Sequence, residues 1–399
     1  MSFVKNINSC NLFIGLYSAY LLLRAKESST ITGYLLLLII AISLGYFIFI
    51  QFKMKQPTVL KWLNIVIYMF ALYGFIYILW GETVHDYSGT VSKINYLKKI
   101  AASLLPIYPF YYFGRKGLLS LKFLKFWIPV FLIISIYSFN SYYNLLLQHA
   151  QEKGSLATEF TNNTSYLFVS ILPLIFLRKK NLTITYIYIG ICALFIVMGV
   201  KRGAIITGIL CIFYYLYKQF FNAKGYKRYI FIFFSIIAII IVGYYITEFI
   251  NESNYFNYRL NNTLVGNVSG RDNLYNKLII IFQNSNVSSM LFGHGADSTV
   301  YFTTLYAHND WLEILTNQGI LGIIIYLGYF FAFYRTWRKY RHDKIIGKCL
   351  GGILIVLFFE TLFSMSYTQY TLFICIAYGY CAAYIQSMSK MKSIYVHRA

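Results

Sequence analysis

A polar cluster made of His308, Asn309, Asp310 and Glu313 stands directly before an apolar run from Ile320 to Phe333. The apolar run predicts a membrane helix, and titratable groups at the mouth of such a helix are costly unless they serve a function. An imidazole is suited to accept a proton near neutral pH. We therefore take His308 as a candidate general base, with the cluster around it as a candidate active site.

Two cations occupy a short turn, because Lys201 and Arg202 lie within the sequence Gly199 to Gly203. One interpretation is a pair of side chains that reach the lipid headgroups. The other is an anion site, in which the glycines let the backbone approach a phosphate. The residue types leave both interpretations open.

A third cation, Arg271, follows Ser269 and precedes Asp272 at the start of a predicted helix. A serine with an acid three residues later resembles a capping box. An arginine in the first turn opposes the helix dipole, which favours an anion there. Arg271 is therefore a candidate anion ligand, and the alternative is a surface pair with Asp272.

Three further features stand near the cluster. Gly319 and Gly322 form a Gly-x-x-Gly pattern that most simply permits close helix packing. Glu360 lies in an expected span near its outer end, where it can hold His308 or an arginine, or reach the headgroups. His294, between Gly293 and Gly295, is interpreted as a turn residue.

The composition predicts the scaffold that positions these residues. Hydrophobic residues make up 58% of the 399, charged residues 12%, and the mean hydropathy is +0.58. These values indicate an all-α, polytopic integral membrane protein, since a spanning helix needs roughly 20 apolar residues. We expect about twelve spans, near residues 8–23, 31–52, 60–80, 97–113, 120–137, 164–177, 182–199, 204–220, 228–249, 314–334, 345–365 and 369–388.

Charge sets the expected orientation. With both termini in the cytoplasm, every cytoplasmic segment is basic, and of the 13 acidic residues only Asp343 falls inside, as the positive-inside rule requires. The net charge of +22 thus needs no nucleic-acid partner and fits attraction to anionic membrane lipids. We expect a single membrane domain over 1–399, with one large outer loop at 250–313 that contains short helices. Loops this long are usually functional.

The pattern His308-Asn309, nine residues, Gly319, two residues and Gly322 is similar to the signature of the O-antigen ligase and O-antigen polymerase superfamily. The span number, the large outer loop, and the settings of Arg202 and Arg271 also resemble that family. The resemblance implies a GT-C-like glycosyltransferase of the bacterial inner membrane that works at the periplasmic face without a metal or other cofactor.

The resemblance also implies substrates and roles. The donor would be a glycan on undecaprenyl diphosphate, with Arg202 and Arg271 on the diphosphate and His308 on the acceptor hydroxyl. Lys201, Asn309 and Glu360 are further candidates for substrate contacts. No Asp-x-Asp metal pair occurs in the expected outer loops, and arginine can grip phosphate in place of a metal.

Three functions remain open at this point. The acidic and aromatic continuation from Asp310 to Glu313 favours an O-antigen or capsular polysaccharide polymerase, whose acceptor is a lipid-linked repeat unit and whose partners can include a chain-length regulator. An O-antigen ligase would transfer the glycan to lipid A–core instead. A lipid-linked glycan flippase would carry charges at mid-membrane in several spans and keep its outer loops short.

Overall fold

The computed structural model describes residues 9–24, 29–54, 59–80, 85–86, 89–90, 93–152, 162–178, 182–222, 225, 229, 244, 247, 271–295, 298–363 and 372–396. Apart from loops, these residues are helical except for a small antiparallel hairpin of His85–Asp86 (β1) and Gly89–Thr90 (β2). The all-α prediction is therefore confirmed for the described part of the chain.

The helices follow one another from the N-terminus without further strands in these ranges. The first nine are α1 (Ser9–Arg24), α2 (Ser29–Lys53), α3 (Lys61–Trp80), α4 (Lys93–Leu104), α5 (Ile107–Arg115), α6 (Leu121–Glu152), α7 (Ser165–Ile175), α8 (Leu182–Met198) and α9 (Arg202–Asn222). The others are α12 (Arg271–Gln283), α13 (Val287–Phe292), α14 (Ser298–Thr303), α15 (Asp310–Tyr340), α16 (Gly347–Phe363) and α17 (Leu372–Val396).

Within these ranges, four helices are long and apolar enough to cross a membrane, namely Thr30–Lys53, Leu121–Asn144, Arg202–Phe221 and Asp310–Tyr340. Shorter apolar helices cover Lys61–Ile76, Ser165–Ile175 and Leu182–Met198. Large apolar side chains such as Phe52, Ile133 and Phe213 are exposed on their surfaces, as lipid-facing positions require. The architecture is that of a helical membrane protein. The number of twelve spans and the GT-C-like arrangement stay predictions.

Two of the expected spans have a different form in the structure. The span at 97–113 is broken, because α4 ends at Leu104 and Pro106 is the N-cap of α5. A proline has no backbone N–H and clashes with the preceding turn, so it favours a helix start over a helix interior. The expected span at 228–249 lies outside the described residues, apart from 229, 244 and 247.

The expected span at 164–177 is instead the short helix α7. It has 11 residues, all of them buried, and is about 16 Å long at 1.5 Å per residue. That length is too short for a hydrocarbon core of about 30 Å. The helix packs against α6, α8, α9, α16 and α17, so its uniform hydrophobicity reflects burial inside the protein and not contact with lipid.

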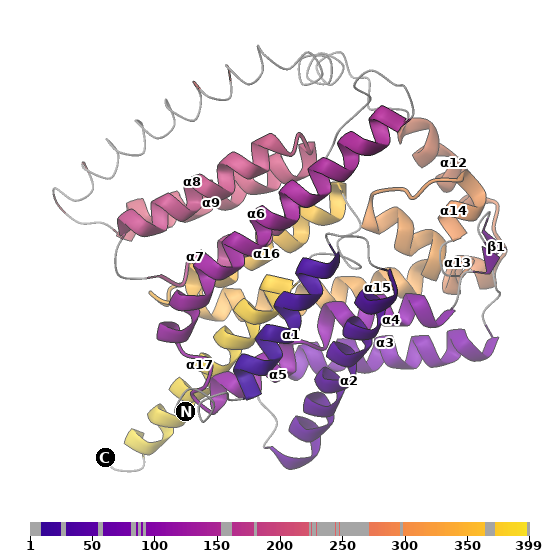
Figure 1. Ribbon diagram of the computed structural model, residues 1–399. Coiled ribbons are helices and arrows are strands. Elements are labelled where there is room, and N and C mark those ends of the chain that lie inside the picture. The colour runs from indigo at the N-terminus through magenta and orange to yellow at the C-terminus, as the bar shows by residue number, and fades with distance from the viewer. Residues whose placement is uncertain are drawn as a thin grey trace.

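The arrangement of the helices separates two ends of the bundle. Helices α8 and α9 lie side by side, and α12, α13 and α14 gather at the end of the bundle on the right of Figure 1. The beginning of α1 and the end of α17 lie at the opposite end. The predicted short helices of the 250–313 segment are present in its described part, and they contact α15.

Helix α15 is kinked at Gly319, whose φ of 66° and ψ of −162° are not helical. A Cβ added there would lie 2.5 Å from the carbonyl oxygen of Leu291 and 2.6 Å from the nitrogen of Gly293. At Gly322 an added Cβ would first meet Gln318, 2.3 Å away in the same chain segment. The predicted close packing between helices is confirmed at Gly319, because Leu291 belongs to α13 and Gly293 is its C-cap, whereas the kink was not predicted. Gly319 bends the chain and lets the segment at 291–293 approach its backbone.

The kink gives a direct test. Gly319→Ala should lower the free energy of unfolding by about 2 kcal/mol or more, because only glycine is at ease at these dihedral angles and the methyl group has no space. Thermal unfolding of the purified protein in detergent would measure the loss. Gly328→Ala in the same helix is the control, since its Cβ would meet only Val66, at 3.4 Å. Equal melting temperatures for the two variants would contradict this account of Gly319.

Candidate functional site

His308 lies in the loop between α14 and α15 and is exposed. Its φ of 52° is in the left-handed region, which is uncommon for a residue other than glycine. The next residue, Asn309, is the N-cap of α15, and its Oδ1 accepts hydrogen bonds from the backbone N–H groups of Trp311 (3.0 Å) and Leu312 (3.3 Å). Because Asn309 caps the helix, the imidazole of His308 is left for other chemistry.

The buried carboxylate of Glu313 holds the loop before His308. Its Oε1 accepts a hydrogen bond from the backbone N–H of Ala307 at 2.5 Å. Its Oε2 accepts from the hydroxyl of Thr299 at 2.6 Å and from the side-chain amide of Asn317 at 3.3 Å. One side chain of α15 thereby fixes both α14 and the backbone one residue before His308.

The same end of α15 also carries the segment at 293–295. The backbone N–H groups of His294 and Gly295 donate to the carbonyl oxygens of Thr316 (2.8 Å) and Asn317 (3.0 Å). The Nε2 atom of His294 lies 2.7 Å from the hydroxyl of Ser285, just after α12. His294 is thus a turn residue, as predicted, and it connects α12, which begins with Arg271, to the framework around α15.

The cationic turn rests on the beginning of α7. The carbonyl oxygen of Gly199 accepts a hydrogen bond from the backbone N–H of Asn162 at 2.9 Å. The side chain of Asn162 donates to the carbonyl of Phe139 at 3.0 Å and accepts from the backbone N–H of Thr164 at 3.0 Å. The next turn residue, Val200, has a φ of 48°, an outlier for a β-branched residue. Strain of this kind persists only where the surrounding structure imposes it.

Lys201 and Arg202 follow this turn, and both are half-buried. Arg202 is the first residue of α9. At Gly203 an added Cβ would lie 2.3 Å from both Phe363 Cβ and the hydroxyl oxygen of Tyr166. The glycine beside the cations therefore brings the start of α9 against the end of α16 and against α7.

The structure brings His308, Lys201 and Arg271 together from three separate segments. The pKa of His308 is lowered to about 4, first by partial removal from water and then by the positive charges of Lys201 and Arg271. His308 keeps exposed surface. Of the causes that lower its pKa, the charges of Lys201 and Arg271 are the ones that substitutions can remove. At pH 7 the imidazole is neutral and can accept a proton.

Glu360 belongs to a second, buried group. It is 3% exposed, and the charge of the fully buried Asp310 acts on it. Asp310 accepts a hydrogen bond from the hydroxyl of Tyr326 at 2.6 Å, whereas Glu360 Oε1 has no hydrogen-bond partner among the described residues. Glu360 is therefore influenced by Asp310, whereas the charges that act on His308 are those of Lys201 and Arg271.

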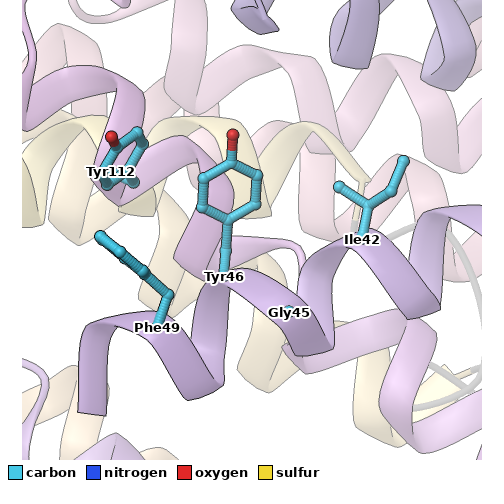
Figure 2. A pocket seen from close by; sticks show the side chains of 5 residues that line it. All are labelled: Ile42, Gly45, Tyr46, Phe49 and Tyr112. Carbon is cyan, nitrogen blue, oxygen red and sulfur yellow. The ribbon is translucent and has the colours of Figure 1, made fainter. Parts of the chain in front are cut away.

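Two further features of the described residues bear on the chemistry. In the ranges that the structure describes, no group of three His, Cys, Asp or Glu side chains is placed to hold a metal ion. A hollow of about 270 Å³ lies between α2 and α5 and is lined by Ile42, Gly45, Tyr46, Phe49 and Tyr112, as Figure 2 shows. Its lining is apolar apart from the tyrosine hydroxyls. It lacks the acid, base and cations that the His308 site has.

Comparison of the sequence with protein-family models finds no matching family, and comparison with curated proteins finds no significant match. The resemblance to the O-antigen ligase and polymerase superfamily therefore rests on the residues quoted above.

Sequence reasoning did not find the side chains that hold the site in place. Asn162 lies in a segment that has the composition of an ordinary outer loop, and Thr299 and Asn317 stand in no motif. Glu313 was visible in the polar cluster, but its partners come from α14 and from the loop before His308. No pattern in the sequence predicts such contacts, because the residues that make them come from different segments and meet only in the folded protein.

The electrostatic arrangement predicts a measurable titration. In the purified protein with ¹³C-labelled histidine, the His308 resonance should titrate near pH 4. Lys201→Gln or Arg271→Gln should move its pKa upward, towards the ordinary value of about 6.5, because each removes a positive charge. Since the folded pKa is the lower one, His308 contributes stability above about pH 6.5 that is lost as the pH falls towards its folded value.

Two controls make the titration decisive. His308→Gln assigns the resonance by its disappearance. Lys277→Gln removes an exposed cation from the same helix as Arg271 and should leave the titration in place. An unchanged pKa in both Lys201→Gln and Arg271→Gln would show that the cations do not act on the imidazole.

Proposed function

We propose that this protein is a metal-independent membrane glycosyltransferase that acts as an O-antigen or capsular polysaccharide polymerase. It would transfer a glycan from undecaprenyl diphosphate to a lipid-linked repeat unit. The observation that carries the proposal is the exposed, neutral His308 beside the positive charges of Lys201 and Arg271. A proton acceptor next to two cations suits a reaction that consumes a hydroxyl and releases a diphosphate.

The reaction can be written with named groups. The acceptor hydroxyl oxygen attacks the anomeric carbon of the donor sugar, and the bond between that carbon and the diphosphate oxygen breaks. The electron pair leaves with the diphosphate, whose charge Lys201, Arg202 and Arg271 offset. The hydroxyl proton passes to His308, which is worth about 10²–10⁴-fold in rate for a general base.

Donor binding would also adjust the base. The free imidazole is weakly basic because it is partly removed from water and because the positive charges of Lys201 and Arg271 act on it. A bound diphosphate would offset those charges and raise the pKa of His308 towards neutrality, so that the base becomes effective when the donor is present. Titration of the His308 resonance with undecaprenyl diphosphate added would test this, and an unchanged pKa would exclude the effect.

Of the other candidate residues, Asn309 can contact the substrate directly, whereas Glu360 would act indirectly. The oxygen of the Asn309 side chain is used for the helix cap, which leaves its NH₂ group for a sugar hydroxyl. Glu360 would influence the site through its electrostatic interaction with Asp310. Its burial argues for an indirect contribution and against direct contact with the sugar.

The location follows from charge and apolar surface. We propose the bacterial inner membrane, with both termini cytoplasmic and the His308 site at the periplasmic face, because the basic segments then lie inside. The placement of α12, α13 and α14 at one end of the bundle, opposite the start of α1 and the end of α17, is compatible with this orientation (Figure 1). A chain-length regulator is a further proposed partner.

Substitution of His308 and of the two arginines proposed to hold the diphosphate is the main test. His308→Ala, Arg202→Ala and Arg271→Ala should each abolish long-chain glycan while the protein still inserts in the membrane. Loss of the base alone should cost about 100-fold or more in rate. Glycan gels of a complemented deletion strain would show unit-length chains. Lys277→Ala, an exposed cation of α12, is the control and should support normal chains.

The gel also separates the alternative functions. Normal chain length in the His308→Ala strain would contradict its role as base. An uncapped core with accumulated lipid-linked polymer in the deletion strain would identify a ligase. Loss of all surface glycan, with repeat units held inside the cell, would identify a flippase.

Metal removal gives an independent prediction. Transfer activity of the purified enzyme should survive chelation with EDTA, because arginine and lysine side chains compensate the charge of the leaving group in this proposal. Activity would be measured as the lengthening of a lipid-linked acceptor. Addition of Mg²⁺ or Mn²⁺ to the chelated enzyme is the control and should change the rate little. A strict requirement for either ion would refute the cation-based mechanism.

A further inference from the structure

A buried cation lies far from the His308 site. Arg178, just after α7, is 7% exposed, and its Nε atom has no hydrogen-bond partner within the part of the chain that the structure describes. The guanidinium carbon lies 5.1 Å from the centroid of the Tyr188 ring. An aromatic face supplies part of the stabilisation that a buried cation needs, but it does not replace the hydrogen bond that the Nε–H group lacks.

A second cation belongs to the same cluster. The Nζ atom of Lys348, at the start of α16, lies 5.2 Å from the centroid of Tyr215. Tyr215 stacks on Phe176 with a centroid distance of 4.5 Å, and Phe176 is two residues before Arg178. The ends of α7 and α9 and the start of α16 thus place two positive charges around one aromatic cluster.

This cluster is separate from the proposed active site. Helix α8 has 17 residues and is therefore about 25 Å long. Arg178 precedes its first residue and Lys201 follows its last.

The surface beside the cluster is apolar. Leu182 and Ile187 of α8 are 47% and 54% exposed, and Tyr217 and Phe221 of α9 are 48% and 63% exposed. On helices of this length and hydropathy such side chains face acyl chains. A ligand that meets both the cations and this surface must carry an anionic head and apolar tails.

We propose that Arg178 and Lys348 form a binding site for the phosphate of an anionic phospholipid. The planar guanidinium can donate its unpartnered Nε–H to a phosphate oxygen, and the ammonium group of Lys348 adds a point charge. The acyl chains would lie against α8 and α9. Anionic lipids gather at basic pockets between membrane helices. The site does not depend on the proposed glycosyltransferase activity.

The test is native mass spectrometry of the full-length protein in detergent, with phosphatidylglycerol, phosphatidylcholine and inorganic phosphate as probes. The wild-type protein should bind phosphatidylglycerol at least tenfold more tightly than phosphatidylcholine, and inorganic phosphate should not displace it. Arg178→Gln should weaken the binding of phosphatidylglycerol at least tenfold.

Arg335→Gln is the matched control. Arg335 also lies over an aromatic ring, 4.7 Å from the centroid of Trp62, but it is exposed. Its substitution should leave phosphatidylglycerol binding unchanged. An equal loss in both variants would mean that only bulk charge matters and would overturn the site.

Other outcomes are equally decisive. If inorganic phosphate competes as well as the lipid, the ligand is a free anion and the lipid assignment is wrong. If Arg178→Gln fails to fold, the lipid preference of the wild-type protein still decides, since equal binding of phosphatidylglycerol and phosphatidylcholine would refute the proposal. Arg178→Lys, which keeps the charge but loses the planar fork, should give intermediate binding.

Discussion

The end of the bundle that carries His308 depends on the buried carboxylate of Glu313. A buried charge is tolerated only when hydrogen bonds replace its water, and Glu313 obtains them from Thr299, Ala307 and Asn317. Each donor belongs to a different piece of structure, namely α14, the loop before His308, and α15. Because the carboxylate must keep all of these bonds, the loop has little freedom, and the left-handed backbone at His308 can be held.

The same principle applies to the cationic turn on the other side of the site. The backbone N–H of Asn162 holds Gly199, and its side chain holds the start of α7. These bonds fix the turn in which Val200 has a strained φ. Helix α7 is buried along its whole length, so this anchor belongs to the rigid interior. Lys201 and Arg271, which come from different segments and repel one another, are thus held where both act on the imidazole of His308.

The fold was predictable where composition alone decides it. Long apolar stretches such as 30–53 and 121–144 form helices because lipid leaves the backbone no other way to satisfy its hydrogen bonds. The prediction of a membrane span was wrong at 164–177, because a helix buried in protein and a helix exposed to lipid are equally apolar in sequence. The run at 164–177 is as apolar as a span, yet α7 is covered by protein on all sides. At Gly319 the close packing was predicted, but the kink was not, since a dihedral angle cannot be read from a spacing of glycines.

The sequence by itself determined the class of protein and the membrane-facing helices, because hydrophobicity and chain length act locally. It also singled out His308, Lys201, Arg202 and Arg271 as residue types able to handle a proton and an anion. Only the tertiary structure decided which of them meet. It placed Lys201 and Arg271 where their charges act on His308, placed Asp310 where its charge acts on Glu360, and left Arg178 buried just after α7. Such proximity arises from packing between distant segments, and no local pattern encodes it.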